Sequence, residues 1–460
     1  MEERLNADDE RGTRVAVDPQ PEAHRTEAAV IRARTGTDGR RRLCVIGAGS
    51  TYTPELVEGL IGQRDELMVD DLVLHDIDQH RLATLAGLTT RMLRSASMPT
   101  DVIVEPDLDR AVTGAHAVFV QIRVGGQAAR LLDETVPARH GLLGQETTGP
   151  GGFAKALRTV PVVLAIADRV RDLAAADAWL INFTNPVGIV TRALLDDGHR
   201  AVGLCNFAIG IERRLASVLA VEPDRVRVET AGLNHLSWVR AVRVDGLDVL
   251  SEVLETFGPA YADEMGIDRA LPSALGALPS PYLRYYYEPQ ATVAAQAKRR
   301  PRAAEVADLE KRLLTAYADP ALDHKPSLLE GRGGAFYSRA AADLVTSLLT
   351  GRARTRVVNG RGDGTVRGLA ADDVVEMPFR IGAGGPRPVA TAPLPPDMLG
   401  LVQSVTAYER LTVEAAIAGD RTIAQRALMA HPLVGRWTLA GDVLDDLLDA
   451  GRRHLPRFWL

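Results

Sequence analysis

A buried strand that runs directly into a glycine-rich turn is the feature that most constrains the fold of this chain. Residues 42–56 read RLCVIGAGSTYTPEL, in which a mostly apolar segment precedes Gly47 and Gly49 and a helix start follows. The two glycines allow the backbone to turn tightly and to approach a bound pyrophosphate, whose charge the helix N-terminus attracts. The turn therefore predicts a nucleotide-binding βα unit, although a tight strand–helix turn without a ligand has the same local sequence.

The residues around this turn indicate which nucleotide is bound. Tyr52 occupies the place of the third glycine of the usual fingerprint, and Ser50 and Thr51 can instead donate hydrogen bonds to phosphate. Asp76 ends the next predicted strand, where an acid binds a ribose hydroxyl and repels a 2′-phosphate. The pattern favours NAD over NADP. Asp78 competes for this role, and the alternative for either acid is a helix N-cap.

Strands and helices alternate through the first half of the chain. Strands are predicted over 42–46, 71–76, 100–107, 115–122, 178–184 and 199–206, and helices over 53–63, 78–95 and 153–174. Such a series of right-handed βαβ units predicts a doubly wound, mostly parallel sheet. Beyond about residue 225, apolar and polar residues alternate as in antiparallel strands. The later predicted elements are helices over 302–318, 335–350 and 398–456 and a short strand pair over 354–369 and 374–382.

We therefore expect an α/β fold in three parts. Residues 1–40 have little apolar periodicity and are expected to form a flexible extension. Residues 41–225 should form a Rossmann-like NAD-binding domain. Residues 226–460 should form an α+β, largely helical domain that carries substrate, metal and oligomer contacts. This is the plan of the lactate and malate dehydrogenases.

Composition restricts the class of protein. The 460 residues include 54 basic and 60 acidic side chains, with a net charge of −6 and no long basic stripe, which argues against nucleic acid as a partner. Two cysteines in so long a chain indicate a reducing compartment. The polar N-terminal segment has no signal-peptide core, and we find no stretch of about 18 apolar residues that could cross a membrane. These features predict a cytoplasmic protein.

Cys205 and His235 each stand where a predicted strand breaks into small and polar residues. A thiolate and an imidazole can together hold a divalent metal ion with positions left open. Either residue alone would more often be a buried structural side chain. Because ligands of open α/β sheets bind at the carboxyl ends of the strands, we expect this pair to share one site with Asn185 and Asn206.

Three further segments are too polar or too aromatic for an ordinary core. Arg123 and Arg130 follow a predicted strand and could clamp an anionic substrate, or could form a solvated basic face. Glu146 lies in a glycine-rich turn that could contact substrate or could simply start a helix. The segment 279–289 contains four of the nine tyrosines, most of which should pack, but a tyrosinate beside a cation can act as a base.

Taken together, these segments resemble family 4 of the glycoside hydrolases, the NAD- and divalent-metal-dependent group. The resemblance spans about residues 41–458 and rests on ordered motifs: GAGSTYTPEL, QIRVGG, GQETTGPGGFAKALRTVP, NFTNPVGIVT, VGLCN, GLNHLSW, PYLRYYY, RGGAFYSRAA, DDVVEMP and LTVEAAIAGDR. Asn206 directly after Cys205, with Arg123 and Arg130, is similar to the 6-phospho-β-glucosidase branch. Ala208 departs from that branch, which usually has proline there.

The resemblance implies hydrolysis of 6-phospho-β-glucosides by a redox–elimination–addition mechanism. In this cycle NAD takes a hydride from C3, the C2 proton is removed, the aglycone is eliminated, water adds, and the hydride returns. The resemblance also implies that Cys205 and His235 hold the divalent metal ion, with Mn²⁺ as the first candidate, and that Arg302 contacts the sugar. Tyr282 is the base by its place in the motif, with Tyr285 as the fallback. Homodimers or homotetramers are expected.

Three alternatives remain open on the sequence. A dehydrogenase of the malate/lactate type would share the nucleotide half and release NADH. A non-catalytic sugar-phosphate sensor would share the fold. Within the family, the substrate could be a non-phosphorylated or α-linked glycoside. With Asn206 in place of an acid, no protein group is identified that protonates the leaving oxygen.

Overall fold

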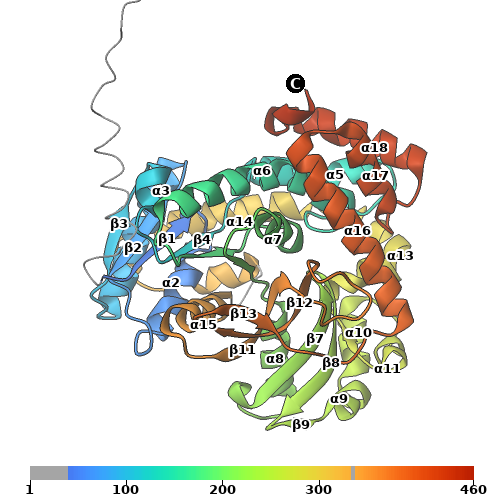
Figure 1. Ribbon diagram of the computed structural model, residues 1–460, viewed down its shortest axis with the longest axis horizontal. Coiled ribbons are helices and arrows are strands. Elements are labelled where there is room, and N and C mark those ends of the chain that lie inside the picture. Colours follow the sequence, from blue (N-terminus) through green and yellow to red (C-terminus); the bar gives the residue numbers. More distant parts are fainter. Residues whose placement is uncertain (1–39, 333–336, 460) are drawn as a thin grey trace, which may run out of the picture.

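The computed structural model describes residues 40–332 and 337–459 and is built on a nine-stranded sheet (Figure 1). Its strands are β1 (Arg42–Ile46), β2 (Asp71–His75), β3 (Asp101–Val104), β4 (Ala117–Val120), β5 (Trp179–Asn182), β6 (Ala201–Gly203), β11 (Arg354–Arg361), β12 (Val374–Gly382) and β13 (Gly385–Pro388). Six of them are parallel in the order β3-β2-β1-β4-β5-β6, the doubly wound order of dinucleotide-binding sheets. The order reverses between β1 and β4, which opens a crevice there. The predicted fold class is confirmed.

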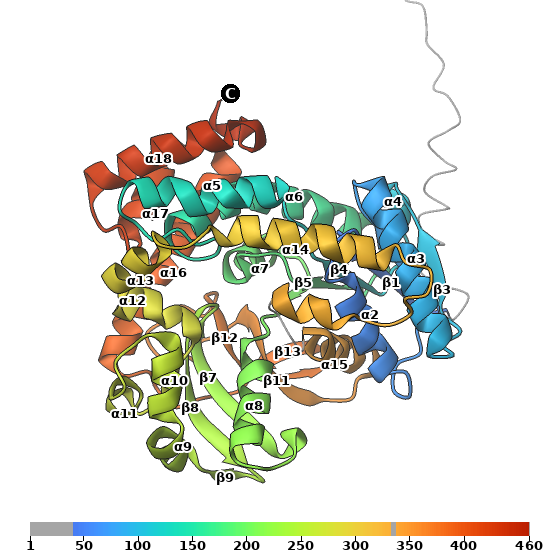
Figure 2. The same ribbon diagram turned by 180° about the vertical axis from the view of Figure 1, so that it is seen from behind.

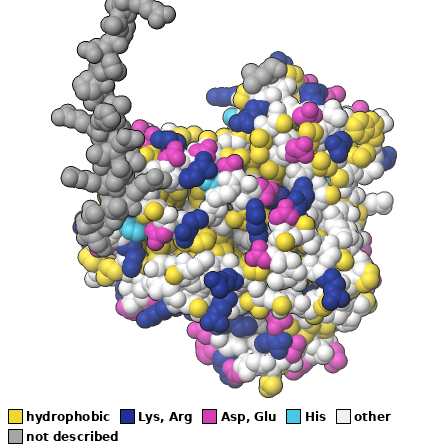
Figure 3. All heavy atoms as spheres, viewed as in Figure 1, with side chains coloured by type: hydrophobic (Ala, Val, Ile, Leu, Met, Phe, Trp, Pro, Cys, Tyr) yellow, Lys and Arg dark blue, Asp and Glu magenta, His cyan; other side chains and the backbone are white. Residues whose placement is uncertain are grey.

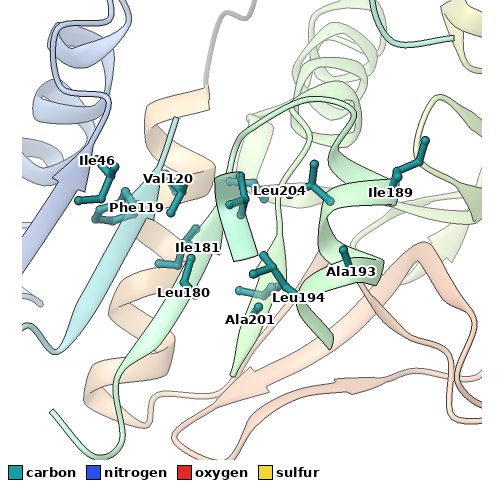
Figure 4. Packing of buried hydrophobic residues seen from close by; sticks show 14 of the residues in the cluster. Ile46, Phe119, Val120, Leu180, Ile181, Ile189, Ala193, Leu194, Ala201 and Leu204 are labelled. Carbon is teal, nitrogen blue, oxygen red and sulfur yellow. The ribbon is translucent and has the colours of Figure 1, made fainter. Parts of the chain in front are cut away.

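The parallel strands other than the edge strand β3 are largely buried, because helices cover both faces of the sheet. The helices are α2 (Thr53–Gly62), α3 (Gln79–Ser95), α4 (Leu108–Val112), α5 (Gly126–Arg139), α6 (Gly149–Leu173), α7 (Val187–Asp196), α8 (Phe207–Val218), α9 (Leu250–Thr256), α10 (Gly258–Met265), α11 (Leu271–Leu275), α12 (Arg284–Tyr287), α13 (Pro289–Gln296), α14 (Arg302–Tyr317), α15 (Tyr337–Thr350), α16 (Pro396–Ala418), α17 (Arg421–Ala430) and α18 (Trp437–Gly451). In Figure 4, Ile46, Phe119 and Ile181 project from neighbouring strands into one apolar layer. Such runs of buried apolar residues are typical of parallel strands.

A second, antiparallel sheet carries its own apolar core. It contains β7 (Val226–Leu233), β8 (Leu236–Val244), β9 (Leu247–Asp248) and β10 (Leu278–Pro279). Its buried residues, Val228 and Val242 among them, form a cluster separate from the main core. Figure 1 shows this sheet below the parallel one, beside α8, α9 and α10. Burial alternates only at the start of β7, whereas the rest of β7 and most of β8 are buried at consecutive positions.

Three strands of the main sheet come from the C-terminal half of the chain. Strand β11 is antiparallel to β6 and to β12, and β12 pairs with β13. The sequence predicts a short strand pair here but not that it extends the nucleotide-binding sheet. The sheet therefore spans the division expected near residue 225, and that domain division stays a prediction.

The helical spacing over 398–456 corresponds to three helices, α16, α17 and α18. Gly419 adopts a left-handed conformation (φ 70°) after α16, and the Asp420 side chain then caps α17. Pro432 and Gly435 separate α17 from α18. The strand expected over 100–107 is also shorter, since β3 ends at Val104.

Helix α6 corrects the expectation that no segment has the length and apolarity to cross a membrane. The helix is long enough and apolar enough to do so, but 78% of its most apolar window is buried inside the fold, as expected of a core helix.

Figure 2 shows α14 running alongside α5 on the same side of the molecule. Acidic and basic side chains are interspersed over the face seen in Figure 3. The extension predicted for residues 1–40 lies outside the described residues, apart from Arg40.

Candidate active site

One large cavity of about 1580 Å³ lies at the carboxyl ends of the parallel strands. Gly47, Asp76 and Cys205 reach it shortly after β1, β2 and β6. The predicted residues that line it are Gly47, Gly49, Ser50, Asp76, Arg123, Arg130, Glu146, Asn185, Cys205, Asn206, His235, Tyr282 and Tyr285. The structure thus brings together residues that are up to about half the chain apart.

Two predicted residues are not brought to the cavity. The Thr51 side chain is fully buried, and its hydroxyl accepts a hydrogen bond from Arg332 at 2.5 Å. Arg302 lies at the start of α14, is 47% exposed, and contacts Glu305 at 2.9 Å and the Gly331 carbonyl at 2.9 Å. Their proposed contacts with phosphate and sugar gain no support from this geometry.

The glycine-rich turn has the close approaches that require glycine. Gly47 has a φ of 86°, and a Cβ on Gly49 would lie 2.8 Å from the Asp76 carboxylate. The Asp76 carboxylate instead accepts the Gly49 backbone N–H at 2.8 Å. Asp78 is the N-cap of α3, accepting from Arg81 N. Asp78 thus caps α3 and Asp76 braces the turn, and both line the cavity.

Arg332, the first residue of the RGGAFYSRAA motif, also lines the cavity, although no role could be predicted for it from the sequence. Its guanidinium lies 4.4 Å from the centre of the Tyr52 ring and 2.8 Å from Glu310. It reaches the turn from a segment some 280 residues later in the chain. The ring of Tyr52, which replaces the third glycine, is thus covered by the Arg332 guanidinium. This contact depends on the tertiary structure and could not be predicted from the residues near Tyr52 in the sequence.

Cys205 and His235 enter the cavity from different sheets. Cys205 follows β6, and His235 lies in the tight turn between β7 and β8 with a φ of 64°. Burial lowers the pKa of His235 to about 3, so its imidazole is neutral and can donate a lone pair. Burial, and then the nearby Glu376 carboxylate, raises the pKa of the Cys205 thiol. A soft sulfur and a neutral imidazole that line one cavity are a donor set that fits a divalent transition metal.

Glu376 is a second residue that the sequence analysis assigns no role. It is 2% exposed in β12, accepts from Asn234 and Ser237 at 2.9 Å each, and also contacts Cys205. Burial raises the pKa of this carboxyl. An acid inside the otherwise apolar run VVEMPF was the signal available in the sequence, since a buried carboxylate needs partners.

The arginines predicted to clamp an anion lie in a buried charge cluster rather than on a solvated face. Glu146 forms ion pairs with Arg123, with Lys155 at 2.7 Å and with Arg130 at 3.3 Å. Burial alone would raise the pKa of Glu146, but the three cations lower it well below its usual range. Lys155, which the sequence analysis missed, is 2% exposed, and burial followed by the charge of Arg123 lowers its pKa to about 7. Arg130 also contacts Glu134 at 2.8 Å.

The tyrosine cluster divides into one residue stacked on His235 and others that mainly pack. The Tyr282 and His235 rings are 3.5 Å apart at their centres and tilted by only 6°. Tyr285 meets Tyr282 edge-on at 6.2 Å. Tyr286 contacts His431, and Tyr287 accepts from Trp238 at 2.9 Å. Burial, and then the charge of Cys205, raises the pKa of Tyr282 well above 10, so its deprotonation requires a nearby cation.

A different group of possible metal ligands lies elsewhere, at Asp168, Asp197 and His199. Arg171 forms ion pairs with both aspartates, and His199 lies 2.9 Å from Asp197. None of the three lines the cavity. Their contacts are those of a partly exposed ion-pair network.

The strand order and the crevice place the chain in the class of proteins with the dinucleotide-binding fold of malate dehydrogenase. The malate dehydrogenase structure of Salinibacter ruber superposes with a TM-score of 0.51 at 16% identity, over 84% of this chain and 98% of that one. The chain belongs to glycosyl hydrolase family 4. The family's N-terminal part matches residues 42–221, and its C-terminal domain matches residues 230–434.

Two relatives are similar over nearly their whole length. A probable 6-phospho-beta-glucosidase of Bacillus subtilis is 40% identical over 91% of this chain and 98% of its own. The 6-phospho-beta glucosidase of Thermotoga maritima, solved with manganese, NAD⁺ and glucose-6-phosphate, superposes with a TM-score of 0.83 at 32% identity, over 90% of this chain and 99% of that one. The predicted membership of family 4, and of its phospho-β-glucosidase branch, is confirmed.

Proposed function

We propose that this protein hydrolyses 6-phospho-β-glucosides, using bound NAD and a divalent metal ion, with Mn²⁺ as the first candidate. The observation that carries the proposal is the stack of Tyr282 on His235, in the cavity that Cys205 and the glycine-rich turn also line. One substrate bound in this cavity could thus contact a base, a metal-binding pair and a nucleotide-binding turn at the same time. The relatives bind or act on the same chemical groups, which supports the proposal.

Cys205 and His235 are proposed to hold the metal ion, and Gly47, Gly49 and Asp76 the nucleotide. When bound, NAD supplies a hydride acceptor at C3 of the sugar and the metal ion supplies a Lewis acid for the oxygens on C2 and C3. The Asp76 carboxylate disfavours a 2′-phosphate by charge repulsion, which selects NAD. Ser50 lines the same end of the cavity, where its hydroxyl can donate to phosphate.

Tyr282 is proposed to remove the C2 proton, with Tyr285 as the fallback. The ring stack fixes the plane of Tyr282 against the metal ligand, so its hydroxyl shares the surroundings of the metal site. A cation there would oppose the effect of burial on the tyrosine pKa. The Tyr282 hydroxyl would thus become a competent base only when the site is loaded, which couples proton removal to metal binding.

The sugar phosphate is proposed to lie against Arg123, Arg130, Asn185 and Asn206. Arg123 and Arg130 line the cavity and, with Lys155, pair with Glu146, so guanidinium N–H donors lie at the cavity wall. Arginine guanidinium groups match phosphate oxygens with paired N–H donors. Glu146 is held ionised by those cations, which suits an acceptor for sugar hydroxyls rather than a proton donor.

The decisive experiment is hydrolysis of p-nitrophenyl β-glucoside 6-phosphate with NAD and Mn²⁺ present and with each omitted. Nitrophenol release that requires both, without net NADH, is the expected result. Turnover of only the unphosphorylated or the α-linked sugar would overturn the substrate assignment and keep the mechanism. Stoichiometric NADH would favour the dehydrogenase alternative, and binding without turnover the sensor.

The protein is further proposed to act in the cytoplasm as a homodimer or homotetramer. Cys44 and Cys205 are both free and buried thiols, which supports a reducing compartment. Trp437, Met429 and Ile417 are at least 40% exposed on the C-terminal helices, which supports an interface there. Sedimentation of the purified protein measures the assembly directly.

A further inference from the structure

We propose that Thr147 is a positioning residue for His235, because its hydroxyl fixes which ring nitrogen of that histidine carries the proton. The inference rests on the proposed function, in which His235 holds the metal ion. Thr147 lies just before α6, and His235 lies between β7 and β8, 88 residues later. The Thr147 Oγ1 atom and the His235 Nδ1 atom are 2.9 Å apart.

The side-chain oxygen of Gln145 decides the direction of this hydrogen bond. It accepts the backbone N–H of Thr147 at 2.5 Å and that of Thr148 at 2.7 Å. Because a backbone N–H can only donate, the atom that receives both must be the amide oxygen and cannot be the amide nitrogen. Thr147 Oγ1 lies 2.8 Å from the same oxygen. The single hydroxyl proton of Thr147 is therefore donated to Gln145.

The hydroxyl oxygen of Thr147 can then only accept from His235. Nδ1 of His235 must carry the proton, and a neutral imidazole has a single N–H. The lone pair is left on Nε2, which becomes the nitrogen that binds a metal ion. Hydrogen bonds of this kind orient the ligand ring and raise its basicity in metal sites. The chain Gln145–Thr147–His235 thus prepares the tautomer before any metal arrives.

The ring of His235 is restrained a second time by Tyr282. The stack at 3.5 Å and 6° sets the plane of the imidazole, while the bond to Thr147 sets its rotation within that plane. Thr147 and Tyr282 both line the cavity. Loss of the Thr147 hydroxyl would leave the plane of the imidazole ring unchanged, but the proton of His235 would no longer be held on Nδ1. The effect of this loss on metal binding can therefore be separated from a general loss of packing.

The test is the Mn²⁺ dissociation constant of the substrate-free protein, measured by electron paramagnetic resonance of the free ion. Thr147→Val keeps the shape of the side chain and should weaken Mn²⁺ binding about 10- to 100-fold, the usual effect of losing such a bond. Thr147→Ser restores the hydroxyl and should bind Mn²⁺ nearly as tightly as the wild type. Thr148→Val is the matched control, because Thr148 reaches Gln145 through its backbone. Unchanged NAD affinity and thermal unfolding would confirm that each variant is folded.

A second readout reports the tautomer itself. Nitrogen-15 NMR of metal-free, histidine-labelled protein should show a protonated Nδ1 for His235, assigned from the signal lost in His235→Gln. In Thr147→Val that signal should shift toward protonated Nε2, which a purely structural role would not cause. A wild-type Nε2–H signal, or a Thr147→Val protein that binds Mn²⁺ like the wild type while His235→Gln does not, would overturn the role of Thr147. Wild-type Mn²⁺ affinity in His235→Gln would instead overturn the metal site, and this inference with it.

Discussion

Replacing Tyr282 by Phe removes one hydroxyl while keeping the ring that stacks on His235. The stack at 3.5 Å does not involve the hydroxyl, so folding and metal binding should persist. A positioned general base contributes about 10²- to 10⁴-fold to a rate. The expected loss in kcat is therefore of that size, or about 3 to 5 kcal/mol in activation free energy. KM, NAD affinity and Mn²⁺ affinity should change little.

The assay is steady-state hydrolysis of p-nitrophenyl β-glucoside 6-phosphate, with and without deuterium at C2. In the wild type, product formed in D₂O should carry deuterium at C2, because the proton removed by Tyr282 exchanges with solvent. The matched control is Tyr286→Phe, since the half-buried Tyr286 ring stacks on His431 at 5.9 Å and does not line the large cavity. That variant should retain wild-type exchange at C2.

Three results would refute this reasoning. A Tyr282→Phe protein with kcat within a few-fold of the wild type would exclude Tyr282 as the base. A larger loss in Tyr285→Phe than in Tyr282→Phe would assign the base to Tyr285, which meets Tyr282 edge-on at 6.2 Å. Loss of Mn²⁺ affinity in Tyr282→Phe would show that the hydroxyl acts at the metal instead.

Three further predictions concern the metal, the nucleotide and the charge cluster. Cys205→Ser replaces a soft ligand with a weak one and should reduce Mn²⁺ affinity by at least about 100-fold in the same resonance assay, with NAD affinity unchanged. Asp76→Asn keeps an acceptor for the Gly49 N–H and removes the charge, so the preference for NAD over NADP in fluorescence titrations should fall by about tenfold, or 1.4 kcal/mol; an unchanged preference would contradict this. Burial, and then the charge of Arg123, lowers the pKa of Lys155 from 10.5 to about 7. Between these two pH values Lys155 is protonated more often in the unfolded chain than in the folded one, so the free energy of unfolding rises with pH. Lys155→Met should flatten that rise in urea unfolding compared between pH 7 and about pH 9.

The local features of the fold could be predicted because they depend on neighbours in the sequence. The turn after β1 needs Gly47 for its positive φ, a local requirement that the sequence indicates, whereas the close approach of Gly49 to Asp76 is seen only in the structure. Apolar runs bounded by polar residues locate β1, β2 and β4 for the same reason. Cys205 and Asn185 could be placed at one edge because parallel strands share their carboxyl ends.

Only the tertiary structure decided which distant groups meet. Lys155, Glu376 and Arg332 reach the cavity region from a helix, an added strand and a late loop, and no sequence period connects them. Thr51 belongs to the glycine-rich turn and Arg302 follows the tyrosine segment in the sequence, which is why both were predicted to reach the site. In the structure the Thr51 side chain instead points into the fold, where it meets Arg332, and the Arg302 side chain contacts the Gly331 carbonyl. The spacing of apolar and polar residues along the chain determines which segments form helices or strands and where the strands end. The direction of an individual side chain and the docking of the second sheet depend instead on packing across the whole molecule.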